Sequence, residues 1–319
     1  MGFLTQYGLF LLKTLTLVIA FLITFAGFIA LSRKPRKPKL EIISLNKQFF
    51  ELKAKLIHEL GGKKPAKFKP SKEKKPHLFV VEFTGDIKAS QVESLRDTIN
   101  AILTVATTHD EVVVKLESPG GMVSGYGLAA AQLQRIRDKN IPLTVCIDKV
   151  AASGGYLMSC VANRIIAAPF AIVGSIGVVA QLPNFHRWLK KNDIDVELVT
   201  SGEYKRTLTI LGENTEKGRQ KFQEDLVKIH QAFRQYILSY RDNLNIEEVA
   251  TGEHWLALDA IGLGLVDKLQ TSDEYLMAKM DTHFLYHLSK PTKPSLVEKF
   301  TKSTAQLFIA LQDFLSLKQ

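Results

Sequence analysis

The N-terminal part of the chain is apolar almost without interruption. From Thr14 to Leu31 the sequence contains no charged residue, and about 20 apolar residues allow a helix to cross a bilayer. We therefore expect residues 1–32 to form a transmembrane anchor. A cleaved signal peptide is the alternative, but its charge belongs before the apolar stretch, whereas here the basic cluster 33–39 follows it. A buried core helix is less favoured because the segment lacks a polar face.

The next segment mixes apolar and basic positions. Leu, Ile and Phe recur at three- and four-residue spacing over residues 40–60, which predicts an amphipathic helix that ends at Gly61. Its basic face suits a membrane surface or a neighbouring chain. Residues 61–77 are rich in Lys and Pro and predict a linker. Residues 33–77 are therefore expected to be a basic helical extension.

From residue 78 the apolar residues occur in short runs rich in Val and Ile, separated by helical segments. Strands are predicted at 78–83, 111–117, 142–147, 164–169 and 195–200, and helices at about 90–106, 124–139, 153–163, 183–192 and 215–241. This alternation is typical of an α/β domain with mostly parallel, buried strands. We expect the domain to span 78–270, followed by a C-terminal helical tail over 271–319 that is amphipathic at about 295–315.

The net charge of +10 is concentrated in two tracts. Residues 33–39 contain five Lys or Arg, and residues 61–77 contain seven Lys. Neither tract has aromatic residues interleaved beyond Phe68, and no nucleic-acid-binding signature is present, so no nucleic-acid partner is expected. Cys146 and Cys160 lie in apolar runs, as buried free thiols do, and two cysteines alone make neither a disulfide framework nor a metal site. We expect no metal and no cofactor.

Two glycine-containing turns follow predicted strands. In "ESPGG", Pro119 fixes φ, and Gly120 and Gly121 expose backbone N–H groups where a ligand can lie. Taken alone, this motif also fits an ordinary strand-to-helix turn. In "KVAASGGYLMSC", Ser153 stands among small residues at the start of a predicted helix, whose N-terminus favours a developing oxyanion. The amides of Gly121 and Gly154 would be the two donors.

A nucleophilic serine needs a base, and two residues are candidates. His186 lies in "NFHRWLKK", which indicates the face of an amphipathic helix and makes it the weaker candidate. Lys205 lies in "TSGEYKRTLT", directly after the predicted strand 195–200, where active-site loops of α/β folds gather. A lysine amine accepts a proton only when neutral, and burial and the charge of Arg206 both favour the neutral form. For any single lysine, a solvated surface position is the alternative.

The motifs occur together and in order: "ESPGG", "KVAASGGYLMSCVANRIIAAP", "GSIGVV", "GEYKR" and "TGEHWLALDAIGLGLVDKL". This set resembles peptidase family S49, of the signal peptide peptidase A type, over about residues 78–270. The resemblance implies a ClpP/crotonase-like fold with a Ser-Lys dyad, in which Ser153 is the nucleophile and Lys205 the general base.

The same resemblance gives roles to the residues around the dyad. Ser175 matches a hydroxyl that hydrogen-bonds the lysine amine and orients it. Gly121 and Gly154 match the oxyanion-hole donors, and Gly120 shapes the turn. The small neighbours of Ser153 would then let an extended peptide lie beside it.

The predicted function is that of a membrane-anchored serine endopeptidase that cleaves signal-peptide remnants or other extended hydrophobic peptides. The expected partners are peptide or protein substrates and membrane lipid. Single-domain members of the family form rings in which serine and lysine come from adjacent subunits, so we expect a homo-oligomer, with a dyad inside one chain as the alternative. A crotonase-type acyl-CoA enzyme, which would use carboxylates, and a catalytically silent membrane scaffold remain as other function classes.

The expected location is the bacterial inner membrane, as a single-pass protein. The basic cluster 33–39 favours a catalytic domain in the cytoplasm, because positive residues stay on that side of the membrane. The family resemblance favours the periplasm, and we expect the catalytic domain there.

Overall fold

The computed structural model describes residues 2–32, 40–63, 67–68 and 74–290. It divides into two compact units, one of residues 40–290 and one of residues 1–39 with 291–319. In the second unit the described residues form helix α1 (Gly2–Ser32). No helix in the described part of the chain is both long and apolar enough to span a membrane. The structure therefore does not support the anchor expected at 1–32, and the predicted tail helix at 295–315 lies outside the described residues.

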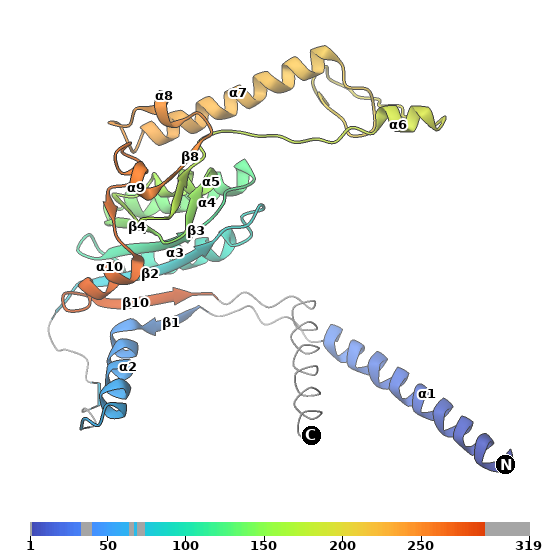
Figure 1. Cartoon of the computed structure of the whole chain (residues 1–319), viewed down its shortest axis with the longest axis horizontal. Helices are drawn as coiled ribbons and strands as arrows, with labels where there is room; N and C mark the ends of the chain where they lie inside the picture. Colours follow the sequence, from blue (N-terminus) through green and yellow to red (C-terminus); the bar gives the residue numbers. More distant parts are fainter. Residues whose placement is uncertain (1, 33–39, 64–66, 69–73, 291–319) are drawn as a thin grey trace. The chain divides into compact units, whose positions relative to one another are not determined.

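The larger unit is built on a seven-stranded sheet (Figure 1). Its strands are, in spatial order, β1 (Glu41–Ser44), β10 (Phe284–Ser289), β2 (His77–Thr84), β3 (Glu111–Glu117), β4 (Leu143–Ile147), β6 (Arg164–Ala167) and β9 (Lys268–Leu269). All neighbours are parallel except β1 and β10. The α/β class predicted from the sequence is confirmed.

Helices cover both faces of this sheet. One face is covered by α3 (Val92–Val105), α4 (Val123–Arg137) and α5 (Gly154–Ser159), and the other carries α2 (Leu45–Glu59) and α10 (Ser272–Lys279). Side chains of β2 alternate between the two cores, as the period of a strand requires: Phe79 and Val81 belong to the first core, and Leu78 and Val80 to the second. The central strands are buried on both sides, which explains their runs of β-branched residues.

A second sheet of three short strands lies beside the end of β3. It contains β5 (Val150–Ala152), β7 (Ile172–Gly174) and β8 (His254–Leu256). Strands β5 and β7 are parallel, and β7 and β8 are antiparallel. An isolated bridge between Ser118 and Ala151 connects this sheet to the first one. Strands of three residues are too short to show a period of two, so the sequence did not predict them.

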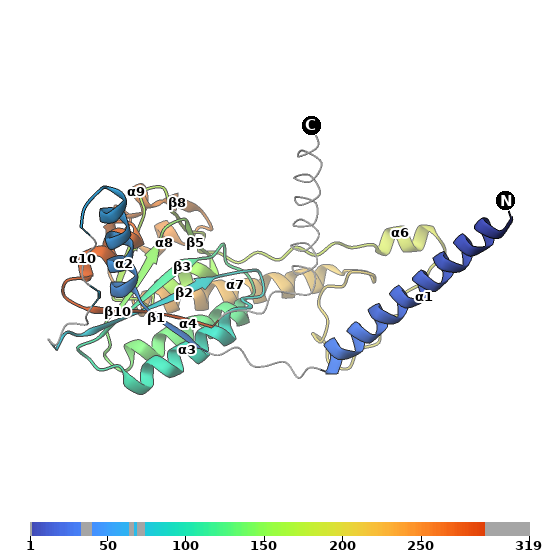
Figure 2. The same cartoon turned by 90° about the horizontal axis from the view of Figure 1, so that it is seen from below.

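Residues 178–215, which we call the arm, contain one helix, α6 (His186–Lys191), and lead into α7 (Glu216–Leu238). Both views show α6 and the N-terminal end of α7 extending away from the sheets (Figures 1 and 2). The strand predicted at 195–200 is wrong: this stretch is exposed and pairs with no other described segment, and a strand needs a neighbour for its backbone hydrogen bonds. Two one-turn helices, α8 (Ile246–Val249) and α9 (Ala257–Ala260), follow α7.

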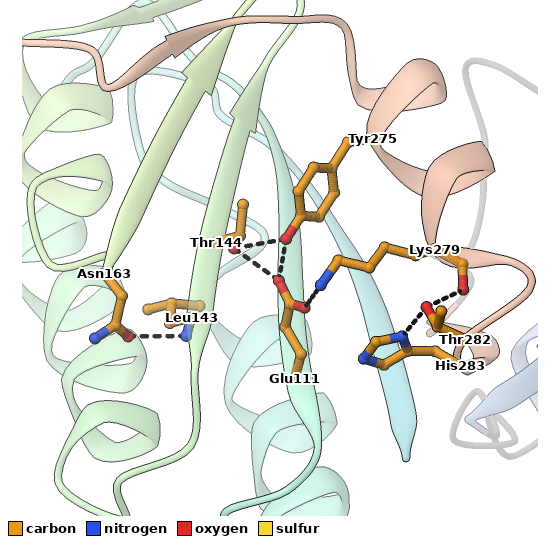
Figure 3. A network of polar contacts seen from close by, with 8 residues as sticks. All are labelled: Glu111, Leu143, Thr144, Asn163, Tyr275, Lys279, Thr282 and His283. Carbon is orange, nitrogen blue, oxygen red and sulfur yellow. Dashed lines mark hydrogen bonds and ion pairs between the residues drawn. The ribbon is translucent and has the colours of Figure 1, made fainter. Parts of the chain in front are cut away.

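The first residue of β3 carries a buried polar network (Figure 3). Glu111 accepts hydrogen bonds from the Tyr275 hydroxyl at 2.5 Å, the Lys279 amine at 2.7 Å and the Thr144 hydroxyl at 2.8 Å. Burial raises the pKa of Glu111, but these three donors outweigh it and hold that pKa below its ordinary value. The network fastens α10 to the sheet, at the end of β3 opposite to Ser118.

Candidate active site

Ser153 stands between the end of β5 and the start of α5. Its amide donates to the Gly174 carbonyl at 2.7 Å, and its carbonyl accepts from the Leu157 amide at 3.0 Å. The turn gives Ser153 a φ of 51° and a ψ of −115°, a conformation that costs a non-glycine residue about 1–3 kcal/mol. Strained backbone of this kind persists where packing imposes it, and it clusters at active sites. This backbone geometry, at the start of α5, makes Ser153 a candidate nucleophile.

Gly120 lies directly against this turn. Its φ is +88°, and a Cβ added there would lie 2.7 Å from Ser153 Cβ and 2.9 Å from the Gly154 nitrogen. A Cβ on Gly121 would lie 2.2 Å from the Ile87 carbonyl oxygen. Only glycine permits both approaches. The "ESPGG" turn and the serine turn, which are separate in the sequence, thus form one site at the ends of β3 and β5.

Two backbone amides at this site remain available. Neither Gly121 nor Gly154 donates a hydrogen bond from its amide to another described residue. Gly154 is the first residue of α5, where the helix N-terminus carries partial positive charge. These amides suit an oxyanion beside Ser153, and their role as donors stays a prediction.

Ser175 is adjacent to Ser153 across the small sheet. Ala152 and Gly174 are register partners in β5 and β7, so each serine is the next residue after a matched pair. Ser175 also has a left-handed backbone, with φ 52°, and its amide donates to the Glu253 carbonyl at 2.6 Å. The position next to Ser153 is compatible with the orienting role that the family resemblance implies.

Lys205 and His186 lie elsewhere in this chain, on the arm. Glu203 pairs with Lys217 at 2.5 Å, which holds the stretch before Lys205 against the first turn of α7. Ile237, the fully buried residue of α7, is near the C-terminal end of that helix. The helical rise places Ile237 roughly 30 Å from Lys217. The α5 helix that follows Ser153 contacts α7, and Ile237 belongs to the same core as α5. The structure therefore brings Ser153, Ser175 and the three glycines together, but not Lys205 or His186.

Sequence reasoning missed three side chains that border the site. The Trp255 ring packs on Gly174, where a Cβ would lie 2.7 Å from a ring carbon. The Ser118 and Tyr126 hydroxyls lie 2.6 Å apart behind Gly120. Ser118 is part of "ESPGG", so its hydroxyl was visible in the sequence, but the direction of its side chain was not. Cys146 and Cys160 are buried free thiols, as predicted.

An α/β domain with a strained serine, glycine amides and a second hydroxyl has the parts of an acyl-transfer site. Two family models match the chain: "Peptidase family S49 N-terminal" over residues 2–133 and "Peptidase family S49" over residues 135–284. The chain belongs to peptidase family S49, and the resemblance seen in its motifs is confirmed.

The curated relatives agree with this assignment. The chain is 45% identical to "Probable protease SohB" of Haemophilus influenzae, over 99% of this chain and 97% of the relative. It is 46% identical to "Probable protease SohB" of Buchnera aphidicola subsp. Schlechtendalia chinensis, over 88% of this chain and 100% of the relative. A more distant relative is "Protease 4" of Haemophilus influenzae, which is 28% identical over 56% of this chain and 30% of that protein.

Among solved structures, the chain is similar to a membrane-bound stomatin-specific protease in complex with a substrate peptide. The TM-score is 0.44 at 13% identity, over 73% of this chain and 99% of the other. The ClpP protease catalytic domain from Plasmodium falciparum gives a TM-score of 0.39 at 11% identity, over 60% of this chain and 85% of the other.

Proposed function

We propose that this chain is a serine endopeptidase with Ser153 as its nucleophile and Lys205 as its general base. The observation that carries the proposal is the strained backbone of Ser153, with φ 51°, against Gly120 and beside the free amides of Gly121 and Gly154. Small residues on either side of Ser153 leave room for an extended substrate strand. Extended hydrophobic peptides, such as signal-peptide remnants, are the substrates we infer from the family.

The proposed reaction proceeds through an acyl-enzyme. The neutral Lys205 amine takes the Ser153 proton while Oγ attacks the substrate carbonyl. The amides of Gly121 and Gly154 stabilise the tetrahedral oxyanion, and the ammonium gives its proton to the leaving amine as the peptide bond breaks. Lys205 then activates water, which attacks the ester and releases the acid and free Ser153. The Ser175 hydroxyl orients the lysine amine throughout.

We propose that Lys205 reaches the Ser153 of a neighbouring copy. Lys205 is exposed, and the arm that carries it lies against the end of α7 far from the small sheet. The arm also exposes large apolar side chains; Val179 is 91% exposed and Val199 is 90% exposed. Apolar surface of this kind is typical of an interface. Association of copies through the arm would bury this apolar surface and surround the lysine amine with protein.

Location is proposed from the sequence alone. The apolar run from Thr14 to Leu31 favours attachment to the bacterial inner membrane, and the family favours a catalytic domain in the periplasm. A reporter enzyme that is active only in the periplasm, fused after Gln319, should be active in cells. A cytoplasmic reporter that is active at the same position would contradict this placement.

The decisive experiment labels the purified protein with a serine-directed fluorophosphonate and assays hydrolysis of an unfolded protein substrate. Ser153→Ala should lose both labelling and hydrolysis, because it removes the attacking oxygen and little else. Lys205→Ala and Lys205→Arg should both be inactive, since arginine stays protonated and cannot act as a base. His186→Ala is the control and should keep its activity. Hydrolysis by Ser153→Ala at the wild-type rate would exclude a serine peptidase, and loss of activity in His186→Ala would favour the histidine instead.

A further inference from the structure

Two buried hydroxyl groups lie directly behind the loop that contains Gly120 and Gly121, which we call the oxyanion loop. The Ser118 and Tyr126 side chains are both 0% exposed, and their oxygens lie 2.6 Å apart. The Ser118 oxygen also accepts the Gly120 amide at 3.1 Å, and the Tyr126 hydroxyl donates to the Asp86 carbonyl at 2.9 Å. These three hydrogen bonds join residues of two loops and the first turn of α4.

The number of hydroxyl hydrogen atoms fixes which group donates in each of these hydrogen bonds. A carbonyl only accepts, so the single Tyr126 hydrogen goes to Asp86. Tyr126 then has no hydrogen left for Ser118, so the Ser118 hydroxyl must donate to Tyr126. Ser118 keeps its lone pairs for the Gly120 amide. Burial raises the pKa of Tyr126, so the phenol stays protonated and donating. Hydrogen bonds aligned in one direction polarise and strengthen one another.

The backbone packs closely against these hydrogen-bonded hydroxyls. A Cβ on Gly85 would lie 2.2 Å from the Tyr126 hydroxyl and 2.3 Å from the Ser118 hydroxyl oxygen. A Cβ on Gly154 would lie 2.3 Å from the Tyr126 ring, so the ring supports the start of α5. Removing either hydroxyl therefore takes a hydrogen-bond partner away from a buried polar group.

The Ser118 backbone fixes the nucleophile side of the same site. Its amide donates to the Val150 carbonyl at 2.8 Å, and its carbonyl accepts the Ala152 amide at 3.0 Å. Ser118 thus holds β5, the strand that ends at Ser153, through its main chain, and the Gly120 peptide through its side chain. One buried residue sets the position of the nucleophile relative to the oxyanion loop.

We propose that Ser118 and Tyr126 are positioning residues, whose hydrogen-bond chain holds the Gly120–Gly121 peptide so that the Gly121 amide faces the oxyanion beside Ser153. The Gly120 amide is occupied by Ser118 and takes no part in binding the substrate. This inference rests on the proposed function, because the oxyanion belongs to the peptidase reaction. These hydrogen bonds act on the transition state more than on substrate binding. Their loss should therefore lower kcat and leave KM nearly unchanged.

The test compares three variants of the full-length protein. Ser118→Ala removes the acceptor of the Gly120 amide, and Tyr126→Phe removes one hydroxyl but keeps the ring under Gly154. Tyr156→Phe is the matched control: Tyr156 is also 0% exposed, and its hydroxyl donates to the Leu265 carbonyl at 3.1 Å, away from the loop. We expect kcat to fall by about 10- to 100-fold in the first two variants, with KM within about twofold, and to stay unchanged in the third.

A second readout does not depend on activity. Hydrogen–deuterium exchange of the peptide containing residues 119–122 should be faster in Ser118→Ala and Tyr126→Phe than in Tyr156→Phe. If the wild-type protein neither hydrolyses peptides nor is labelled by the fluorophosphonate at Ser153, the proposed function fails. Hydrogen–deuterium exchange alone then decides whether the Ser118 and Tyr126 hydrogen bonds hold the loop. Equal exchange in all three variants overturns the inference. In an active enzyme, a kcat that falls no more in Ser118→Ala and Tyr126→Phe than in Tyr156→Phe also overturns it.

Discussion

Ser153 and Ser175 occupy equivalent positions at the ends of two adjacent parallel strands. Each follows one member of the register pair Ala152 and Gly174, and each has a left-handed backbone, with φ 51° and 52°. Adjacent strands are about 4.8 Å apart, so the two serines emerge side by side at one edge of the small sheet. The Ser153 amide donates to the Gly174 carbonyl at 2.7 Å, which fixes one turn against the other.

This arrangement predicts an intermediate loss of activity for Ser175→Ala. The variant removes a hydroxyl that orients the lysine amine but leaves both the nucleophile and the base in place. We expect kcat to fall by about 10- to 100-fold, clearly less than in Ser153→Ala or Lys205→Ala, because a group that only orients contributes less than the groups that react. Single-turnover hydrolysis measures the effect. A loss as complete as that of Ser153→Ala would make Ser175 a reacting group.

Gly120 offers a test of the contact between the two turns. Gly120→Ala places a Cβ 2.7 Å from Ser153 Cβ at a φ of +88°, so either the loop or the nucleophile must move. We expect at least about 100-fold lower activity, with a loss of about 1–3 kcal/mol in the free energy of unfolding. Gly127→Ala in helix α4 is the control, since its Cβ meets nothing within 4 Å. It should keep full activity and gain about 0.5–1 kcal/mol. Equal activity in both variants would contradict the contact.

The sequence predicted the long elements well because their periods are local properties. The buried strand 111–117 and the helix with Leu95, Ile99 and Ile102 on one side are present as β3 and α3. The strand predicted at 195–200 failed because strand formation depends on a partner, which the pattern of one segment does not reveal. Conversely, β10 and β1 form at the edge of the sheet although neither segment was predicted as a strand. Their pairing is decided by tertiary contacts.

The sequence allowed us to predict candidate residues of the site but not how they contact one another. Ser153 and the paired glycines stand out by their composition, but the sequence could not show that Gly120 touches Ser153. Nor could it show the Tyr126 hydroxyl behind the loop, because that contact depends on how α4 packs. The motifs predicted the reacting residues, whereas the hydrogen bonds that support them depend on the tertiary structure.

The network at the start of β3 predicts a pH-dependent contribution to stability. The pKa of Glu111 is lower in the folded protein than in the unfolded chain, so the carboxylate stabilises the fold above its unfolded pKa of about 4.5. That contribution is lost as the pH falls through the folded pKa. Glu111→Gln should destabilise the protein by about 1–3 kcal/mol at pH 7, because Tyr275 and Lys279 lose a charged acceptor.

Denaturant unfolding at pH 7 and at pH 3–4 tests this effect. The stability difference between wild type and Glu111→Gln should shrink at the lower pH. Glu93→Gln is the control: Glu93 is 61% exposed and pairs with Arg96 on the helix surface, so its removal should change stability by less than about 1 kcal/mol at either pH. A difference for Glu111→Gln that grows on acidification would reverse the assigned direction of the pKa shift.

The separation of Lys205 from Ser153 makes the strongest prediction about assembly. Within one chain, Ser153 lies near the C-terminal end of α7 and Lys205 lies near its N-terminal end. At that N-terminal end, Glu203 of the arm pairs with Lys217 at 2.5 Å. A dyad formed inside one chain would require the arm to fold back over the sheet. A dyad formed between chains requires only that the exposed apolar arm pack against the neighbouring copy. We therefore expect active sites at interfaces, each with Ser153 from one copy and Lys205 from the next.

Mixed assemblies test the shared site directly. Ser153→Ala and Lys205→Ala should each be inactive alone, because every interface then lacks one of the two groups. Co-expressed with different affinity tags and purified through both, they should regain part of the wild-type activity. Some interfaces then pair an intact Ser153 with an intact Lys205. The Ser153→Ala, Lys205→Ala double variant, co-purified with either single variant, is the control and should stay inactive, since no interface can hold both groups. Mixed assemblies of the two single variants without activity would place each dyad within one chain, with the arm folded back in the active enzyme.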